Sequence, residues 1–130
     1  MALTVFDETE PYVYLQAVAA VDTPTTPGLA SGNTRTLRID RLQISTDDTA
    51  DVLVFLELDD QAGTIAQLGS LLIPAGAGFD PAVPSVDLLT SAGLAGVGLA
   101  MRGDMRVRVN IPSALTATKT LWIVGLGGFI

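Results

Sequence analysis

Residues 38–60 constrain the fold more than any other part of the sequence. In the second half of this stretch every other residue is apolar, and a spacing of two is the signature of a β-strand with one buried face. These apolar residues are Val52, Val54, Leu56 and Leu58. The first half carries two apolar pairs in different phases, Leu37 with Ile39 and Leu42 with Ile44. A β-bulge near Asp40 and Arg41 would bring both pairs to one face.

Residues 45–51 separate the two halves, and we expect them to form the tight turn of a hairpin, because Asp, Ser and Thr favour turns. The carboxylates of Asp47, Asp48 and Asp51 have two interpretations. They could hold a calcium ion, since hard cations take oxygen ligands, although the spacing departs from the EF-hand loop. The favoured interpretation is a solvated hairpin tip whose side chains bond nearby backbone groups.

The composition excludes several kinds of chemistry. The chain of 130 residues has no cysteine and no histidine, so disulfides, thiolate metal sites and histidine-dependent catalysis are excluded. An aspartate pair or a Lys119 nucleophile remains conceivable, but no motif supports either. We therefore predict a protein that is not an enzyme and that needs no cofactor.

Charge and hydropathy point toward association with other proteins. The net charge is −7, so we expect neither nucleic acid nor an anionic membrane as a partner. Hydrophobic residues make up 48% of the chain and charged residues only 16%. This apolar excess predicts surface that is buried between subunits. Residues 1–10 lack the basic region of a secretory signal, and no apolar run is long enough to span a membrane.

Both ends of the chain carry apolar residues that would have to be shielded from solvent. Residues 1–11 form a candidate N-terminal arm before the sandwich domain at residues 12–130, and Leu3, Val5 and Phe6 are its apolar residues. This arm is either a frayed terminus or a segment that docks on a neighbour. The final pair, Phe129 and Ile130, is either tucked under a loop or docked on a partner.

Further strands are expected at residues 12–21, 65–73, 85–89, 105–111 and 121–126. In the first of these, the set containing Val13, Leu15 and Ala17 is expected to face the core. The glycine-rich residues 90–98 match no phosphate-binding loop, so a flexible or closely packed loop is expected there. The last strand is apolar on both faces, which favours a central position in a sheet or a place against another chain.

The strand at residues 105–111 carries a small cationic stripe. Arg106 and Arg108 alternate with apolar residues, and Arg102 lies nearby in the sequence. The stripe could bind a polyanion. The favoured interpretation is pairing with the acids of a neighbouring strand or subunit, because arginine forms bidentate pairs with carboxylates.

About eight short strands with Gly- and Pro-rich turns predict an all-β, single-domain, jelly-roll-like β-sandwich. At this level residues 34–128 resemble the jelly-roll decoration, or cement, proteins of tailed bacteriophage heads. The resemblance lies in the strand order and in two phrases, IPAGAG at residues 73–78 and VRVNIPSALTATKT at residues 107–120.

This resemblance implies a virion structural protein on the outer surface of the capsid. Members of the family are typically trimers that bind the major capsid protein and reinforce contacts between its subunits, and they supply no catalytic residues. An alternative class is a carbohydrate- or receptor-binding jelly-roll module of a phage fibre or tail. Such modules need exposed aromatic residues, and the candidates are Trp122, Tyr12 and Tyr14. Trp122 is expected to be buried.

Overall fold

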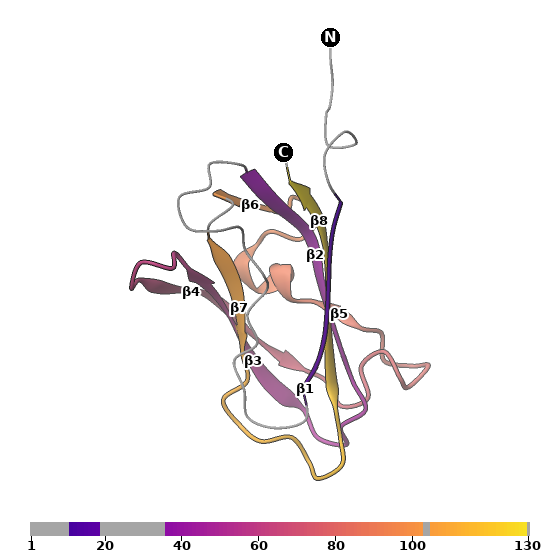
Figure 1. Ribbon diagram of the computed structural model, residues 1–130. Helices are drawn as coiled ribbons and strands as arrows, with labels where there is room; N and C mark the ends of the chain where they lie inside the picture. Colours follow the sequence, from indigo (N-terminus) through magenta and orange to yellow (C-terminus); the bar gives the residue numbers. More distant parts are fainter. Residues whose placement is uncertain (1–10, 19–35, 103–104, 130) are drawn as a thin grey trace.

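The computed structural model describes residues 11–18, 36–102 and 105–129, with residues 11–16 and 129 described by their backbone alone. These described residues form eight strands, arranged as two packed antiparallel sheets, and a short 3₁₀ helix, η2 (Figure 1). No helix in these residues is long and apolar enough to cross a membrane. The elements are β1 (Pro11–Val18), β2 (Thr36–Thr46), β3 (Val52–Asp59), β4 (Ile65–Ile73), β5 (Val86–Asp87), η2 (Leu88–Ala92), β6 (Leu99–Arg102), β7 (Arg106–Asn110) and β8 (Leu121–Phe129).

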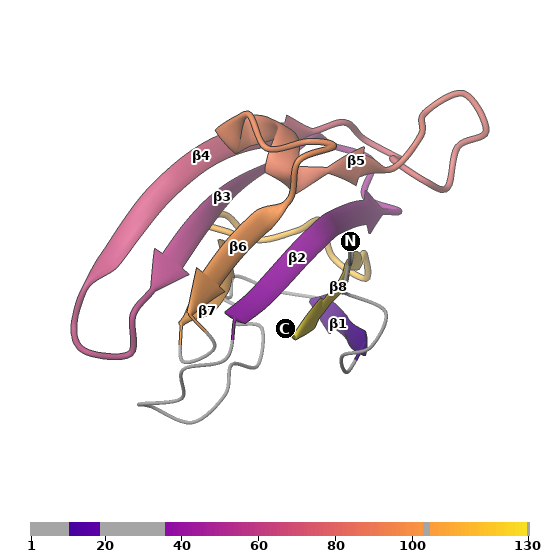
Figure 2. The ribbon, with the colours of Figure 1, turned by 90° about the horizontal axis from the view of Figure 1, so that it is seen from above.

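The two sheets form a β-sandwich. The five-stranded sheet has the order β1-β8-β2-β5, with β6 pairing the other end of β2, and the three-stranded sheet has the order β4-β3-β7. The chain changes sheets between β2 and β3, between β4 and β5, and on either side of β7. Figure 2 shows the two layers from above. The predicted fold class, an all-β sandwich of about eight strands, is confirmed.

The expected hairpin between β2 and β3 is wrong. The two strands lie in different sheets, β2 between β8 and the short strands β5 and β6, and β3 between β4 and β7. Each strand buries an apolar face, and the two faces meet across the core instead of lying edge to edge. Residues 47–51 therefore cross from one sheet to the other, because alternation identifies the buried face of a strand but not its neighbour.

The predicted bulge is confirmed. The register between β2 and β8 shifts between Ile39 and Arg41, as the change of apolar phase requires. The four apolar residues on either side of the bulge are fully buried as a result: Leu37, Ile39, Leu42 and Ile44. In β3, Val52, Val54 and Leu56 are buried as predicted.

The face assigned to the first strand is reversed. Val18 is buried and Ala17 is exposed, whereas the set containing Ala17 was expected to face the core. The register explains the difference, since Val18 pairs with the buried Leu121 and Ala17 pairs with the outward-facing Trp122. Both phases of this strand contain apolar residues, so hydrophobicity alone did not determine which one faces inward.

The segment that follows β5 is more ordered than its glycine content predicts. The expected edge strand at residues 85–89 shrinks to Val86–Asp87, and the chain then forms η2. The carboxylate of Asp87 caps the helix by accepting a hydrogen bond from Leu89 N, and Gly93 ends it with φ 73°. Leu88 and Leu89 are fully buried, so η2 closes the side of the sandwich between β2 and β4.

Glycine at position 69 permits this closure. A Cβ atom at Gly69 would lie 2.5 Å from the carbonyl oxygen of Ser91 and 2.6 Å from its Oγ. We expect Gly69→Ala to push η2 away from β4 and to lower the free energy of unfolding by about 2 kcal/mol. Chemical denaturation measures this effect, and Ser70→Ala, on the exposed side of the same strand, is the matched control. Equal stability of both variants would show that Gly69 does not set the packing of η2.

Candidate contact surfaces

The acidic connection between β2 and β3 is a hydrogen-bonded junction. Asp48 is only 2% exposed, and its Oδ1 accepts hydrogen bonds from Thr116 Oγ1 at 2.6 Å and Ala50 N at 2.9 Å. Its Oδ2 accepts one from Thr116 N at 2.9 Å. Burial alone would raise the pKa of Asp48, but the hydrogen bonds from Thr116, Ala50 and Thr49 outweigh it and lower the pKa below 3.8.

The flanking carboxylates bind two further segments. Asp47 accepts a hydrogen bond from Thr120 N at 2.8 Å, and Asp51 accepts one from Ala75 N at 2.9 Å. These partners are distant in sequence, so the three carboxylates join the connection to the loops before β5 and before β8. No group of three or more acidic, histidine or cysteine side chains that could hold a metal ion occurs in the described part of the chain. The favoured interpretation, a solvated hairpin tip bonded to nearby backbone groups, is wrong: Asp48 is buried, and most of these bonds come from residues distant in sequence, whereas the one from Ala50 N is local.

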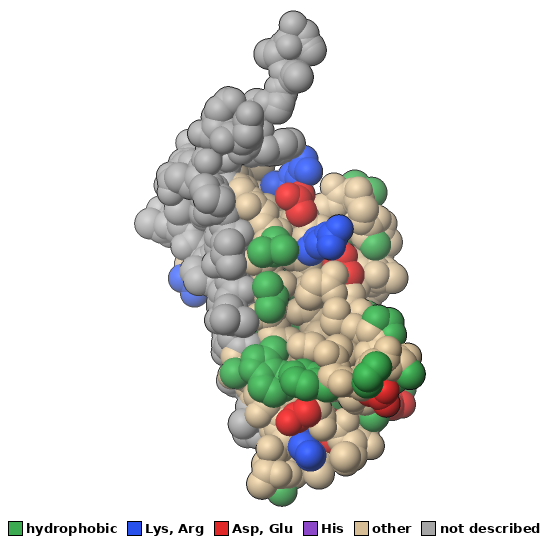
Figure 3. All heavy atoms as spheres, turned by 90° about the vertical axis from the view of Figure 1, so that its right-hand side faces the viewer, with side chains coloured by type: hydrophobic (Ala, Val, Ile, Leu, Met, Phe, Trp, Pro, Cys, Tyr) green, Lys and Arg blue, Asp and Glu red, His purple; other side chains and the backbone are tan. Residues whose placement is uncertain are grey.

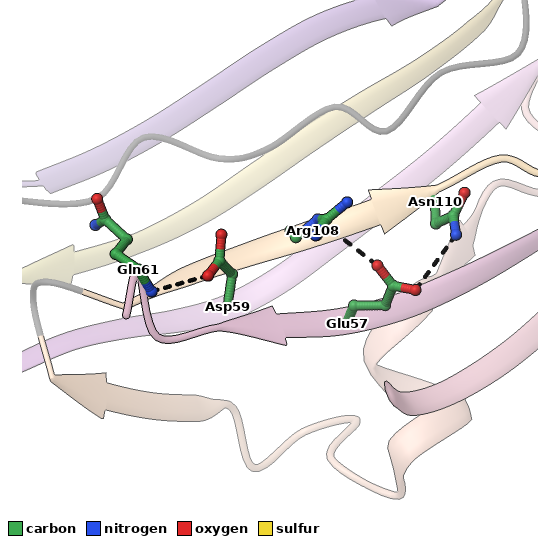
Figure 4. Close-up of polar contacts among 5 residues, drawn as sticks. All are labelled: Glu57, Asp59, Gln61, Arg108 and Asn110. Atoms are coloured by element: carbon green, nitrogen blue, oxygen red, sulfur yellow. Dashed lines mark hydrogen bonds and ion pairs between the residues drawn. The ribbon is translucent and has the colours of Figure 1, made fainter. Parts of the chain in front are cut away.

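The outer face of the three-stranded sheet carries a compact polar cluster (Figure 4). Arg108 Nε lies 3.6 Å from Glu57 Oε1, and Asn110 Nδ2 donates a hydrogen bond to Glu57 Oε2 at 3.3 Å. The side chains of Arg108 and Glu57 are 22% and 14% exposed. Arg108 thus forms an ion pair within the chain across β3 and β7.

Of the other two arginines of the predicted stripe, Arg106 shares the outer face of β7 with Arg108, and only Arg102 lies apart. Arg106 is opposite Asp59 in the register, and its buried Nε has no hydrogen-bond partner among the described residues. Arg102 is at the end of β6 in the other sheet, near Asp60. The pKa of Asp60 is lowered chiefly by hydrogen bonds from Ala62 N and Thr64 N, and Arg102 adds a smaller effect. The three arginines therefore do not form one stripe.

A hydrogen-bonded loop at residues 74–85 projects from the sandwich (Figure 1). Ala77, fully buried, accepts a hydrogen bond from Thr46 N at 2.9 Å, and Gly78 N donates to Val83 O at 2.7 Å. Phe79 follows directly, with 54% of its surface exposed. Its ring lies 4.9 Å from that of Trp122, at an interplanar angle of 34°. A loop fixed in this way holds an exposed aromatic side chain in one position.

The aromatic pair continues into an apolar row on the outer face of β8. Trp122 and Val124 are half-buried there, and Leu126 is exposed. We call Phe79, Trp122, Val124 and Leu126 the β8 surface. In the register, Ser45, Gln43 and Arg41 of β2 lie beside this row. Figure 3 faces the side from which the loop projects and shows hydrophobic side chains gathered on it, with a few charged ones between them.

The contact residues predicted from the chain ends are not in the described structure. Leu3, Val5, Phe6 and Ile130 lie outside the described residues, and Phe129 is described only by its backbone, which pairs with Leu37. Sequence reasoning missed Phe79 and placed Trp122 in the core. An aromatic residue within a Gly- and Pro-rich turn segment was the available signal for Phe79, since such segments lie at the surface.

The described residues enclose no pocket, so these outer surfaces are the candidates for contact with other molecules. A scan against protein-family models finds no match for the chain, and a search of curated proteins finds none either.

Proposed function

We propose that the chain is a decoration protein of a tailed-phage head. In this role it binds the outer surface of the capsid as a homotrimer and reinforces contacts between major capsid subunits without catalysing a reaction. The observation that supports the proposal best is the exposed Phe79, fixed on Trp122 by a hydrogen-bonded loop. Aromatic residues on rigid supports are typical anchors of protein interfaces, because little entropy is lost when they become buried.

Two further features of the surface agree with this role. The β8 surface is a continuous row of apolar side chains, and such rows are typical of surfaces that another protein covers. The charged side chain directly beside Leu126 is the exposed Arg41 of β2, which leaves one positive charge at that end of the row. Arg38 and Asp40 lie further along β2 and pair with each other at 2.6 Å. A pair that is already neutralised adds no net charge to the contact. A trimer would raise the overall affinity even if each single contact is weak, because its three linked sites can bind a repeating lattice at the same time.

The binding test uses heads assembled without their decoration protein by the phage that encodes the chain. We expect the chain to cosediment with these heads, and Phe79→Ser to weaken binding about thirtyfold, as the loss of an interface anchor does. The matched control is Val97→Ser, because Val97 is 69% exposed in the turn before β6 and away from Phe79. If the two variants bind heads with equal affinity, the β8 surface does not contact the capsid.

The proposed trimer and the N-terminal arm have separate tests. Light scattering is expected to give a mass of three 13.5 kDa chains, and a monomer would contradict the avidity argument. Deleting residues 1–10 is expected to weaken capsid binding if Leu3, Val5 and Phe6 dock on a partner. Undiminished binding by the deletion variant would remove the arm from the contact.

A carbohydrate- or receptor-binding module is the second candidate function. Trp122 faces outward and supports Phe79, and Gln43 and Ser85 lie close by with their side chains 3.1 Å apart. Exposed aromatic rings beside amide and hydroxyl groups are typical of sugar-binding surfaces. Trp122 is the only tryptophan, so its fluorescence reports directly on ligands of this surface. Specific binding on a glycan array together with a fluorescence change would favour this function over the first.

A further inference from the structure

β4 is the outer strand of the three-stranded sheet, and among the described residues its second edge pairs with no strand. β4 pairs with β3 alone, and no other hydrogen bond in the described part of the chain involves its backbone. η2 packs against the inner face at Gly69. Figure 1 shows no described strand beyond β4 in its sheet, and Figure 2 shows η2 over the C-terminal half of β4. Within the described part of the chain, the outward N–H and C=O groups of β4 have no partner, and such groups can accept another strand.

The sequence of β4 lacks two common devices that block such pairing, charge and proline, although the register with β3 places a bulge at Leu68. Its nine residues, IAQLGSLLI, include no charged residue and no proline. Edge strands in monomeric proteins are commonly protected by lysine, proline, inward-pointing charges or short length. By comparison, β5 and β6 are only two and four residues long, and β7 carries two arginines. The outer edge of β4 is thus long and carries neither charge nor proline.

The order of residues in β4 matches a second copy of itself in antiparallel register. With the two-fold axis between Leu68 and Gly69, the polar Gln67 faces the polar Ser70 of the second copy. The same register brings Ile65 opposite Leu72 and leaves no two like charges facing one another. The four facing pairs are Ile65 with Leu72, Ala66 with Leu71, Gln67 with Ser70 and Leu68 with Gly69.

The two faces of the sheet also agree in this register. Leu72 pairs with Leu53 of β3 on the outer face, and Ile65 pairs with Asp59 beyond a bulge in which Leu68 of β4 is the extra residue. Because the bulge changes the phase, Ile65, Gln67, Ser70 and Leu72 all belong to the outer face. Ile65 and Leu72 are 49% and 55% exposed in one chain. In the paired state, Ile65 of each copy would cover Leu72 of the other copy, so the contact would form at two places.

We propose that β4 pairs with β4 of a second copy and joins two three-stranded sheets into one six-stranded sheet. The proposal goes beyond the contact with a capsid and does not depend on it. A single strand pair buries less area than a standard protein interface, so the association is expected to dissociate on dilution. A surface that gathers many copies would favour it by raising their local concentration.

Disulfide trapping tests the register. The natural chain has no cysteine, so the double variant Gln67→Cys with Ser70→Cys contributes the only thiols. Facing residues in an antiparallel pair are about 5 Å apart between Cα atoms, within disulfide range, whereas these positions within one strand are about 10 Å apart. Mild oxidation is expected to give a cross-linked dimer on a non-reducing gel.

The matched control is Ile65→Cys with Gln67→Cys, which introduces two thiols on the same edge that do not face each other in this register. It is expected to stay largely uncross-linked. Equal cross-linking of both variants would overturn the register, and a monomer band for both would overturn the pairing.

Charged substitutions at Ile65 and Leu72 test whether two copies associate in solution. The variant Ile65→Lys with Leu72→Lys places two like-charged pairs across the axis and is expected to abolish the rise in mass with concentration. The variant Ile65→Lys with Leu72→Glu faces each lysine with a glutamate and should restore that rise.

Analytical ultracentrifugation between about 10 µM and 1 mM, a range that covers weak association, measures the mass. Circular dichroism confirms that each variant is folded. A natural chain whose mass stays constant across this range would overturn the proposal. The doubly lysine-substituted variant should still bind heads through Phe79, so the two proposals fail independently.

Discussion

Replacing Asp48 with asparagine is expected to lower the free energy of unfolding by about 3 kcal/mol. The carboxylate accepts three hydrogen bonds with its two oxygens, from Thr116 N, Thr116 Oγ1 and Ala50 N. An asparagine side chain has one oxygen, and its NH₂ group would face a donor. A buried donor would then lose its partner, and two elements distant in sequence would separate. Chemical denaturation at neutral pH measures the loss.

The pH dependence of this difference follows from the lowered pKa of Asp48. A carboxylate with a pKa below 3.8 in the folded state stabilises the protein fully above the unfolded value, and the contribution disappears as pH falls through the folded value. The stability difference between the natural chain and Asp48→Asn should therefore be constant above about pH 5 and shrink below it. Asp51→Asn is the control, since its one exposed hydrogen bond to Ala75 N contributes less than about 1 kcal/mol. Equal losses for both variants would contradict a special role for the buried carboxylate.

Gly127→Ala is expected to destabilise the chain by at least about 3 kcal/mol. A Cβ atom at Gly127 would overlap the carbonyl oxygen of Arg38 and lie 2.9 Å from the carbonyl carbon of Arg38 and from Ile39 Cα. These are backbone atoms of β2 beside the bulge, so neither strand can move without breaking the ladder between β2 and β8. The five-stranded sheet depends on this close approach.

The comparison for Gly127 is its neighbour in β8. Leu126→Ala removes a side chain that is 39% exposed on the outer face, and it should cost less than about 1 kcal/mol. Thermal and chemical denaturation of both variants measure the difference. A Gly127→Ala protein as stable as Leu126→Ala would show that the two strands are further apart than the structure has them.

The predictable part of the fold was its strands and their buried faces. Alternation in residues 52–58 identified the inward face of β3, and the change of phase around Asp40 predicted the bulge in β2. Both inferences need only the rule that successive side chains point to opposite faces. The same rule gives no information on which strands are neighbours, and for that reason the pairing of β2 with β3 was wrongly expected.

The surfaces were harder to predict because they depend on contacts between distant segments. Trp122 is in a central strand, which suggested burial, but only the register with Ala17 and Ser45 reveals that it faces outward. The exposure of Phe79 depends on hydrogen bonds that fix its loop against Thr46 and Asp48. The acidic segment was expected to bond locally, yet Asp47 and Asp48 reach residues near the start of β8.

The most direct test of a reinforcing role is the temperature at which undecorated heads lose their integrity, measured while the chain is added. The account predicts that this temperature rises and levels off at the ratio where binding saturates, and that Phe79→Ser shifts the rise to higher protein concentration while Val97→Ser does not. A chain that binds without raising this temperature, or that does not bind heads at all, would contradict the account.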